Sequence, residues 1–153
     1  MANGITYGIN FPFRQSVKGQ YLSLSEKTDE EIRSNLIHLL LTRKGSRYYL
    51  PDFGTRLYEF IFEPLDGETF GVLRGEIEEA INTFIPNLTV QSITIEPYVN
   101  SDKSLGEPIV PEQDIPTYAV PGANTEEYTA KIKIEYIDES NAFGSRQFVI
   151  INL

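Results

Sequence analysis

Apolar residues recur at three- and four-residue intervals between positions 28 and 44, which is the period of an α-helix with one buried face. Thr28 and Glu31 have the spacing of a capping box, in which each side chain satisfies a free backbone N–H group. Gly45 suits the left-handed cap that ends many helices. The pattern therefore predicts a helix over residues 28–44 whose core face is formed by Ile32, Leu36, Leu39 and Leu40, widened by Ile37 and Leu41.

Two further helices are predicted before the pattern changes. A short one over residues 56–62 follows a turn and ends at Pro64, because proline cannot donate a helical hydrogen bond. The next begins at Asp66, whose side chain suits a helix cap, and stops at Pro86. The core face of this last helix is predicted to be Phe70, Leu73, Ile77, Ala80, Ile81 and Phe84.

The second half of the chain alternates with the two-residue period of β-strands. The alternation changes phase at Gln91–Ser92, which predicts a β-bulge between two apolar pairs, Leu88 with Val90 and Ile93 with Ile95. Residues 126–137 alternate without interruption, and residues 147–153 are apolar on both faces. We therefore expect these three segments to form a small, mainly antiparallel sheet.

Two segments lack either period. Residues 1–24 are rich in glycine and aromatic residues and are predicted to be an N-terminal arm that docks two phenylalanine rings on the core. Residues 100–125 contain four prolines and are predicted to be a Pro-rich inserted loop that contributes little to folding. The whole chain, residues 1–153, is expected to be a single α+β domain with three helices packed on one face of the sheet.

Charge and composition narrow the function. The chain has 22 acidic and 13 basic residues, for a net charge of −9, which disfavours nucleic acids and anionic membranes as partners. It contains no cysteine, which suits a reducing cytosol. Its N-terminus lacks the pattern of a secretory signal, and its longest apolar run is too short to cross a bilayer.

Few residues offer catalytic or metal-binding chemistry. The only histidine, His38, lies in a helical apolar run, so we expect it to be structural. A glycosidase needs two carboxylates facing a cleft, and Asp52, Glu63 and Asp66 are the nearest candidates. Asp66 is already explained as a helix cap, and Glu63 lies at the end of a predicted helix. We therefore predict no catalytic, cofactor-binding or metal-binding residue and no cofactor, with a peptidoglycan glycosidase as an alternative.

The segment GSRYYLPDFGTRLYEFIFEPLD at residues 45–66 resembles the baseplate-wedge, sheath-initiator family of contractile phage tails, which has relatives in type VI secretion baseplates and some members labelled lysozyme-like. The matching positions are Phe11, Pro12, Phe13, Gly45, Arg47, Pro51, Phe53, Gly54, Leu57, Phe62 and Pro86. The chain departs from the family where helix and sheet meet. The family often has Trp-Glu-Pro-Arg there, and this sequence has Phe84-Ile85-Pro86-Asn87.

The resemblance implies a structural subunit that occurs in several copies in the tail baseplate and is assembled in the host cytoplasm. It would bind other baseplate wedge proteins and template the first ring of the tail-sheath protein. A regulatory binding module on the same fold is a further alternative. Within the family motif we expect Phe53 to insert in the core, Gly54 to form a tight turn, and Arg47 to bind helix-end carbonyls or a carboxylate.

The terminal strand is the predicted sheath interface. If it lay at the edge of the sheet, another chain could pair with its backbone. Sequence alone also allows a buried central strand. The residues concerned are Phe148, Val149, Ile150, Ile151 and Leu153.

Overall fold

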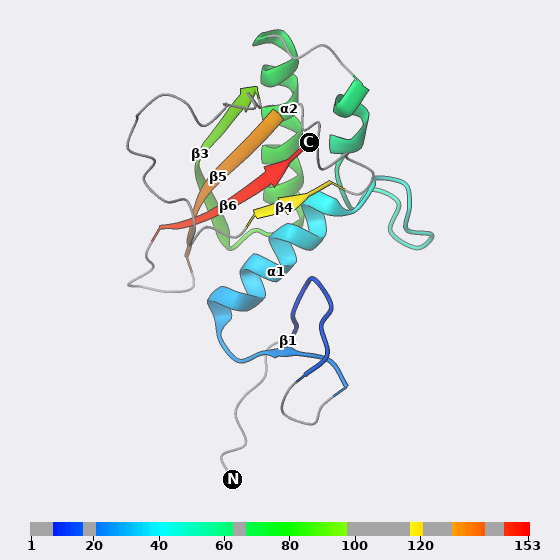
Figure 1. Ribbon diagram of the computed structural model, residues 1–153, viewed down its shortest axis with the longest axis vertical. Helices are drawn as coiled ribbons and strands as arrows, with labels where there is room; N and C mark the ends of the chain where they lie inside the picture. Colours follow the sequence, from blue (N-terminus) through cyan, green and yellow to red (C-terminus); the bar gives the residue numbers. More distant parts are fainter. Residues whose placement is uncertain (1–7, 17–20, 63–66, 98–116, 121–129, 140–145) are drawn as a thin grey trace, which may run out of the picture.

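The computed structural model describes residues 8–16, 21–62, 67–97, 117–120, 130–139 and 146–153. Its elements follow the chain in an α+β order (Figure 1). They are β1 (Gly8–Ile9), β2 (Leu24–Ser25), α1 (Thr28–Leu41), the 3₁₀ helix η1 (Leu57–Phe62), α2 (Gly67–Phe84), β3 (Leu88–Pro97), β4 (Thr117–Ala119), β5 (Ala130–Asp138) and β6 (Gln147–Asn152).

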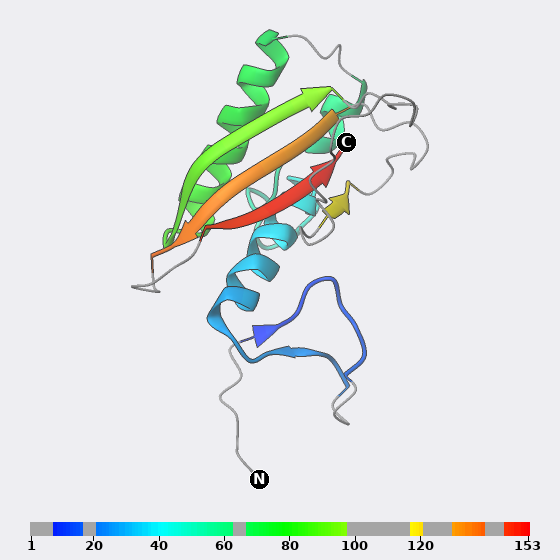
Figure 2. The ribbon, with the colours of Figure 1, turned by 60° about the vertical axis from the view of Figure 1, so that its left-hand side comes forward.

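The main sheet has four strands in the order β3-β5-β6-β4 (Figure 2). Strands β3, β5 and β6 are antiparallel neighbours, whereas β4 runs parallel to β6. The pairing of β3 with β5 shifts register between Val90 and Ser92, which confirms the predicted bulge. A separate two-stranded sheet pairs β1 with β2 in the N-terminal arm.

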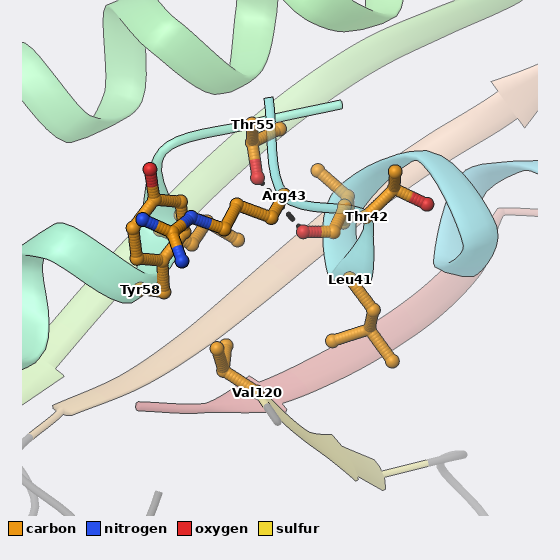
Figure 3. A pocket seen from close by; sticks show the side chains of 8 residues that line it. Leu41, Thr42, Arg43, Thr55, Tyr58 and Val120 are labelled. Atoms are coloured by element: carbon orange, nitrogen blue, oxygen red, sulfur yellow. Dashed lines mark hydrogen bonds between the residues drawn. The ribbon is translucent and has the colours of Figure 1, made fainter. Parts of the chain in front are cut away.

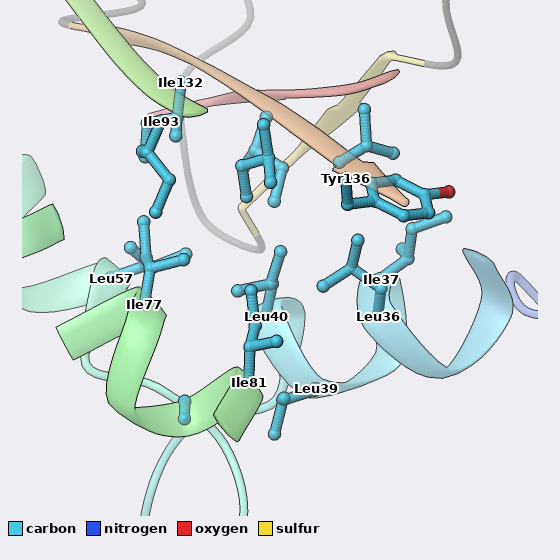
Figure 4. Packing of buried hydrophobic residues seen from close by; sticks show 14 of the residues in the cluster. Leu36, Ile37, Leu39, Leu40, Leu57, Ile77, Ile81, Ile93, Ile132 and Tyr136 are labelled. Atoms are coloured by element: carbon cyan, nitrogen blue, oxygen red, sulfur yellow. The ribbon is translucent and has the colours of Figure 1, made fainter. Parts of the chain in front are cut away.

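Both α-helices pack on the same face of the main sheet (Figure 4). Strand β5 alternates buried and half-exposed residues along its length, as its sequence predicted. Its buried side meets the apolar faces of α1 and α2. The largest side chains that are fully buried include Tyr136, Leu36, Ile37, Leu39, Leu40, Leu57, Leu73, Ile77, Ile81, Ile132 and Ile134.

The prediction of three helices on one sheet was wrong. The structure has two α-helices among its described residues, and the short helix predicted over residues 56–62 is instead the six-residue 3₁₀ segment η1. A segment this short gains little from α-helical cooperativity, and 3₁₀ geometry is common in such connectors. The predicted single sheet is also two sheets, because the arm forms its own β1–β2 pair.

Two parts of the chain differ from prediction. Helix α1 begins at Thr28 as predicted, but the extended Lys27 before it makes no side-chain capping bond, and the helix ends at Leu41 rather than at residue 44 because Thr42 is extended. Residues 117–119, expected to lie in the inserted loop, form β4. The next residue, Val120, is buried in the core, and its N–H donates to the carbonyl of Asn152. This part of residues 100–125 therefore belongs to the fold.

After α1 the chain makes a loop and crosses back over the helix end. We call the contact of residues 54–55 with residues 40–44 the crossing. The Thr55 N–H donates to the Thr42 carbonyl at 2.9 Å, and the Lys44 N–H donates to the Thr55 carbonyl at 3.0 Å. Gly54 has a φ of 116°, and a Cβ atom there would lie 2.4 Å from the Thr42 carbonyl oxygen. The crossing therefore requires glycine at position 54.

Gly45 provides a matched test of that requirement. It also has a positive φ, of 84°, but a Cβ added to it would meet no atom within 4 Å. Gly45→Ala should cost about 1–2 kcal/mol of unfolding free energy, which is the penalty for a left-handed backbone alone. Gly54→Ala should cost clearly more, because the backbone of the crossing must also move. Denaturant unfolding of both variants measures the two free energies of unfolding. Equal decreases would show that the backbone of the crossing can move at little cost to accommodate a Cβ atom at position 54.

Candidate interaction surfaces

An aromatic cluster joins the N-terminal arm, α1, the crossing segment and the end of α2. The Arg47 guanidinium donates to His38 Nε2 at 2.6 Å. The Phe11 ring stacks on the His38 ring with centroids 4.9 Å apart. Phe53 meets His38 edge to face at 5.7 Å and Phe84 at 5.2 Å. These contacts bring together residues that are far apart in the sequence.

The electrostatics of this cluster favour a neutral histidine. Burial lowers the pKa of His38, and the neighbouring Arg47 charge lowers it further. A neutral ring can accept the Arg47 hydrogen bond at Nε2, whereas an imidazolium could not. Arg47 was expected to bind carbonyls or a carboxylate, but its described contacts are with this ring and with the face of Phe53, 4.1 Å from its guanidinium carbon to the ring centroid. Both residues therefore serve packing.

A groove of about 420 Å³ lies beside this cluster. One wall comes from α1 and the other from the connection between α2 and β3, where the chain departs from the family pattern. Its lining combines apolar side chains with polar ones: Ile32, Phe53, Phe84, Ile85 and Pro86 with Thr28, Glu31, Asn35, His38 and Asn87. A lining that combines apolar with polar side chains is typical of protein–protein interfaces.

Strand β6 is an interior strand over most of its length. It lies between β5 and β4, with Ile150 opposite Thr117 and Asn152 opposite Ala119. Four of the five residues predicted to form the sheath interface are buried, namely Val149, Ile150, Ile151 and Leu153. An exposed apolar side is therefore absent at these four positions. The part of β6 that could contact a partner is therefore shorter than the five residues predicted from the sequence.

The part of β6 that no described strand pairs with on the side of β4 is the backbone near Phe148. Backbone groups of a strand point to its two neighbours in turn, and the Leu153 N–H donates to Ala130 of β5, while the Asn152 carbonyl accepts from Val120. By this alternation the Val149 amide faces β5 and the Phe148 amide faces the side of β4. Because β4 starts opposite Ile150, no described strand covers Phe148 on that side.

Of the three carboxylates proposed for a glycosidase, the structure describes only Asp52. Glu63 and Asp66 lie outside the described residues, whereas Asp52 is exposed and lines a hollow of about 300 Å³ with Glu76 and Glu79. Glu76 is paired with Arg56 at 3.1 Å. Within the described ranges, no group of three His, Cys, Asp or Glu side chains could hold a metal ion, and no helix is long and apolar enough to cross a membrane.

The remaining motif residues belong to the crossing and its surroundings. Leu57 is buried and Pro51 is exposed, while the side chain of Phe62 is outside the described part of the chain. From the sequence, Thr55 suits the cap of the short helix predicted over residues 56–62. Its hydroxyl instead donates to the Leu40 carbonyl at 2.8 Å in a buried position, beside a hollow of about 180 Å³ (Figure 3). The only sequence signal for this contact with the end of α1 was the position of Thr55 directly after Gly54.

Two relatives illustrate what the chain is similar to. It is 30% identical over 66 residues to baseplate wedge protein gp25 of Enterobacteria phage T4, a match that covers 43% of this chain and 50% of that protein. The chain thus spans about half the length of the curated relative it matches. It is 26% identical to a chain in the cryo-EM structure of the anti-feeding prophage baseplate, with a TM-score of 0.54, covering 62% of this chain and 74% of that one.

A third similarity concerns the fold alone. A crystal structure of a candidate tail lysozyme from Geobacter sulfurreducens has a TM-score of 0.58, and the match covers 86% of this chain and 93% of that one, at 22% identity.

A family profile described as baseplate wedge protein gp25 matches residues 26–107, which is more than half of the 153 residues. The match spans α1, the crossing, α2 and β3. The predicted family is confirmed, and this chain belongs to the baseplate wedge protein gp25 family.

Proposed function

We propose that this chain is a non-catalytic structural subunit of a contractile-tail baseplate. The observation that carries the proposal is the family match over residues 26–107, which includes the crossing, the whole lining of the groove and the aromatic cluster apart from Phe11. Resemblance to a chain of a baseplate structure supports the same location. The subunit acts in several copies at the virion tail baseplate and enters it during assembly in the host cytoplasm.

The groove is the proposed contact with another wedge protein. An apolar floor between a helix and a connection accepts the apolar side of an amphipathic helix, anchored by side chains at helical spacing. Ile85 and Asn87 stand where the family often has Glu and Arg. The contact in this chain therefore depends on apolar packing and on amide hydrogen bonds at the rim, rather than on charge.

The backbone at Phe148 is the proposed start of the tail sheath. A strand from the first sheath subunit would continue the line of β4 along β6 and pair with the outward-facing amide and carbonyl of Phe148. Strand addition draws its affinity from such main-chain bonds. The buried residues Val149, Ile150, Ile151 and Leu153 support this site by holding β6 in the sheet. They do not need to touch the partner.

The net charge of −9 supports protein partners over nucleic acid or membrane. The carboxylates of the hollow at Asp52 lie beside the Lys44 side chain, and one of them is already paired with Arg56. We therefore assign these side chains to the solvated surface. A peptidoglycan glycosidase remains the contrasting function, because a structure of similar fold carries a lysozyme description.

Filling the groove should block entry into the baseplate. Asn35 is an exposed residue of α1 that lines the groove, so Asn35→Trp should occupy it without disturbing the core. We expect at least about a tenfold loss of the chain from purified tails, the change given by about 1.4 kcal/mol of lost binding. Asn82→Trp, on an exposed position of α2 outside the groove, is the control. Normal incorporation of both variants would contradict the proposed wedge contact.

Proline substitutions along β6 should separate the sheath edge from the folded core. Phe148→Pro removes the outward-facing amide, so the variant should fold and enter the baseplate but fail to start sheath polymerisation. Phe148→Ala keeps the amide and should start the sheath. Val149→Pro removes an amide directed at β5 and should unfold the domain.

Circular dichroism of each β6 variant and electron microscopy of the resulting tails provide the readout. If Phe148→Pro unfolds while Phe148→Ala does not, the amide is needed inside the fold. The edge proposal would then fail.

Purified protein should not degrade peptidoglycan. The expected result is no release of reducing sugar above a buffer control at any enzyme concentration tested. Turnover that Asp52→Asn abolishes, with an unchanged thermal unfolding curve, would replace the structural proposal by the enzymatic one. Asn82→Ala, away from the hollow, is the control for non-specific loss.

A further inference from the structure

Three consecutive large side chains project from the loop that leads from the end of α1 to the crossing. Tyr48 is 92% exposed, Tyr49 is 94% exposed and Leu50 is 45% exposed. We call these three residues the tip. Figure 1 shows their segment as a loop that projects from the body of the molecule beyond the end of α1. Clustered exposed aromatic residues are unusual on a protein that acts alone, and they often mark an interaction site.

The tip rests on a rigid base. The Gly45 N–H donates to the Pro51 carbonyl at 2.7 Å, so the two sides of the loop are joined directly below the tip. The Phe53 N–H donates to the Leu50 carbonyl at 3.1 Å, which links the tip to the aromatic cluster. The two tyrosine rings also brace one another edge to face, with centroids 5.2 Å apart. A group held in this way loses little conformational entropy on binding.

The charge around the tip is opposite to that of the chain. Residues 43–52 contain three cations, Arg43, Lys44 and Arg47, and one acid, Asp52, for a local charge of +2, whereas the chain as a whole carries −9. Arg43 is held against the Tyr58 ring, with its guanidinium carbon 4.2 Å from the ring centroid. Arg47 is held against Phe53. These two contacts fix positive charge at the base of the tip, whereas Lys44 lines the hollow with Asp52, Glu76 and Glu79.

We propose that the tip is an anchor that inserts into an apolar pocket with an acidic rim on a different protein of the baseplate. A projecting aromatic pair fits a concave site, and tyrosine is among the residues that contribute most to protein interfaces. Cations at the base complement carboxylates at the rim of such a pocket. Long-range repulsion between two chains of −9 disfavours a second copy as the partner, and it disfavours nucleic acid for the same reason.

This contact is separate from the groove and the β6 edge, and its placement in the baseplate rests on the proposed function. A competition experiment tests it. Wild-type chain and a Tyr48→Ser, Tyr49→Ser double variant carry different tags and are co-expressed during tail production. Their ratio is then measured in purified particles by mass spectrometry. The double variant should be depleted at least about tenfold, as expected for loss of an aromatic hot spot.

The chain offers a matched control for exposed tyrosine. Tyr21, on the N-terminal arm, is 97% exposed, and Tyr21→Ser should be incorporated as well as wild type. Because the tip is exposed, all variants should keep the wild-type melting temperature. Equal incorporation of the double variant and Tyr21→Ser would overturn the proposal.

A crosslinking experiment identifies the partner of the tip. It also separates the proposed anchor from the proposed baseplate location. A photoreactive phenylalanine analogue replaces Tyr48 or, as control, Tyr21, and crosslinks are mapped in every fraction that contains the chain. The proposal expects crosslinks from position 48 to an apolar, acid-flanked site on another baseplate protein. Crosslinks to a second copy, to DNA or to no protein would overturn it. A third outcome is that the chain is absent from baseplates but crosslinks from position 48 to such a pocket on another protein. That outcome would contradict the proposed baseplate location and still support the anchoring role of the tip.

Discussion

The crossing of the chain over the end of α1 is the contact on which the other features depend. The last carbonyl groups of a helix have no partner within the helix, and burying them without one is costly. Here the Leu40 carbonyl accepts from the buried Thr55 hydroxyl, and the Thr42 carbonyl accepts from the Thr55 N–H. Position 54 must therefore be glycine, because the two backbones approach too closely for a Cβ atom.

The crossing places interaction surfaces on both sides of it. Directly before it, the loop closed by Gly45 and Pro51 carries the two exposed tyrosines. The residue preceding Gly54 is Phe53, which joins the cluster of His38 and Phe84 and lines the groove. Directly after it, Leu57 enters the core. One short stretch of chain thus connects the buried interior to two surfaces that protein partners could use.

What the sequence could predict follows from how far each interaction reaches along the chain. Helices α1 and α2, the bulge of β3 and the alternation of β5 were predictable, because local periodicity reports which side is buried. The pairing of β4 with β6 joins segments more than thirty residues apart and leaves no local period over three residues. The contact of Arg47 with His38 spans only nine residues but was missed for another reason. The positive charge of Arg47 suggested a carboxylate partner, whereas tertiary packing places the His38 ring beside it.

The departure from the family at Ile85 and Asn87 is compatible with the wedge contact proposed at the groove. Exposed ion pairs contribute about 0–1 kcal/mol, because they lose hydration and side-chain freedom when they form. Burying one large aliphatic side chain contributes about 1.5–3 kcal/mol. A groove that exchanges a Glu and an Arg at its edge for Ile85 and Asn87 can therefore keep its affinity through apolar packing alone. It loses the selectivity for partner charge that an ion pair provides. The exchange consequently favours a partner in which the facing residues have become apolar or neutral as well.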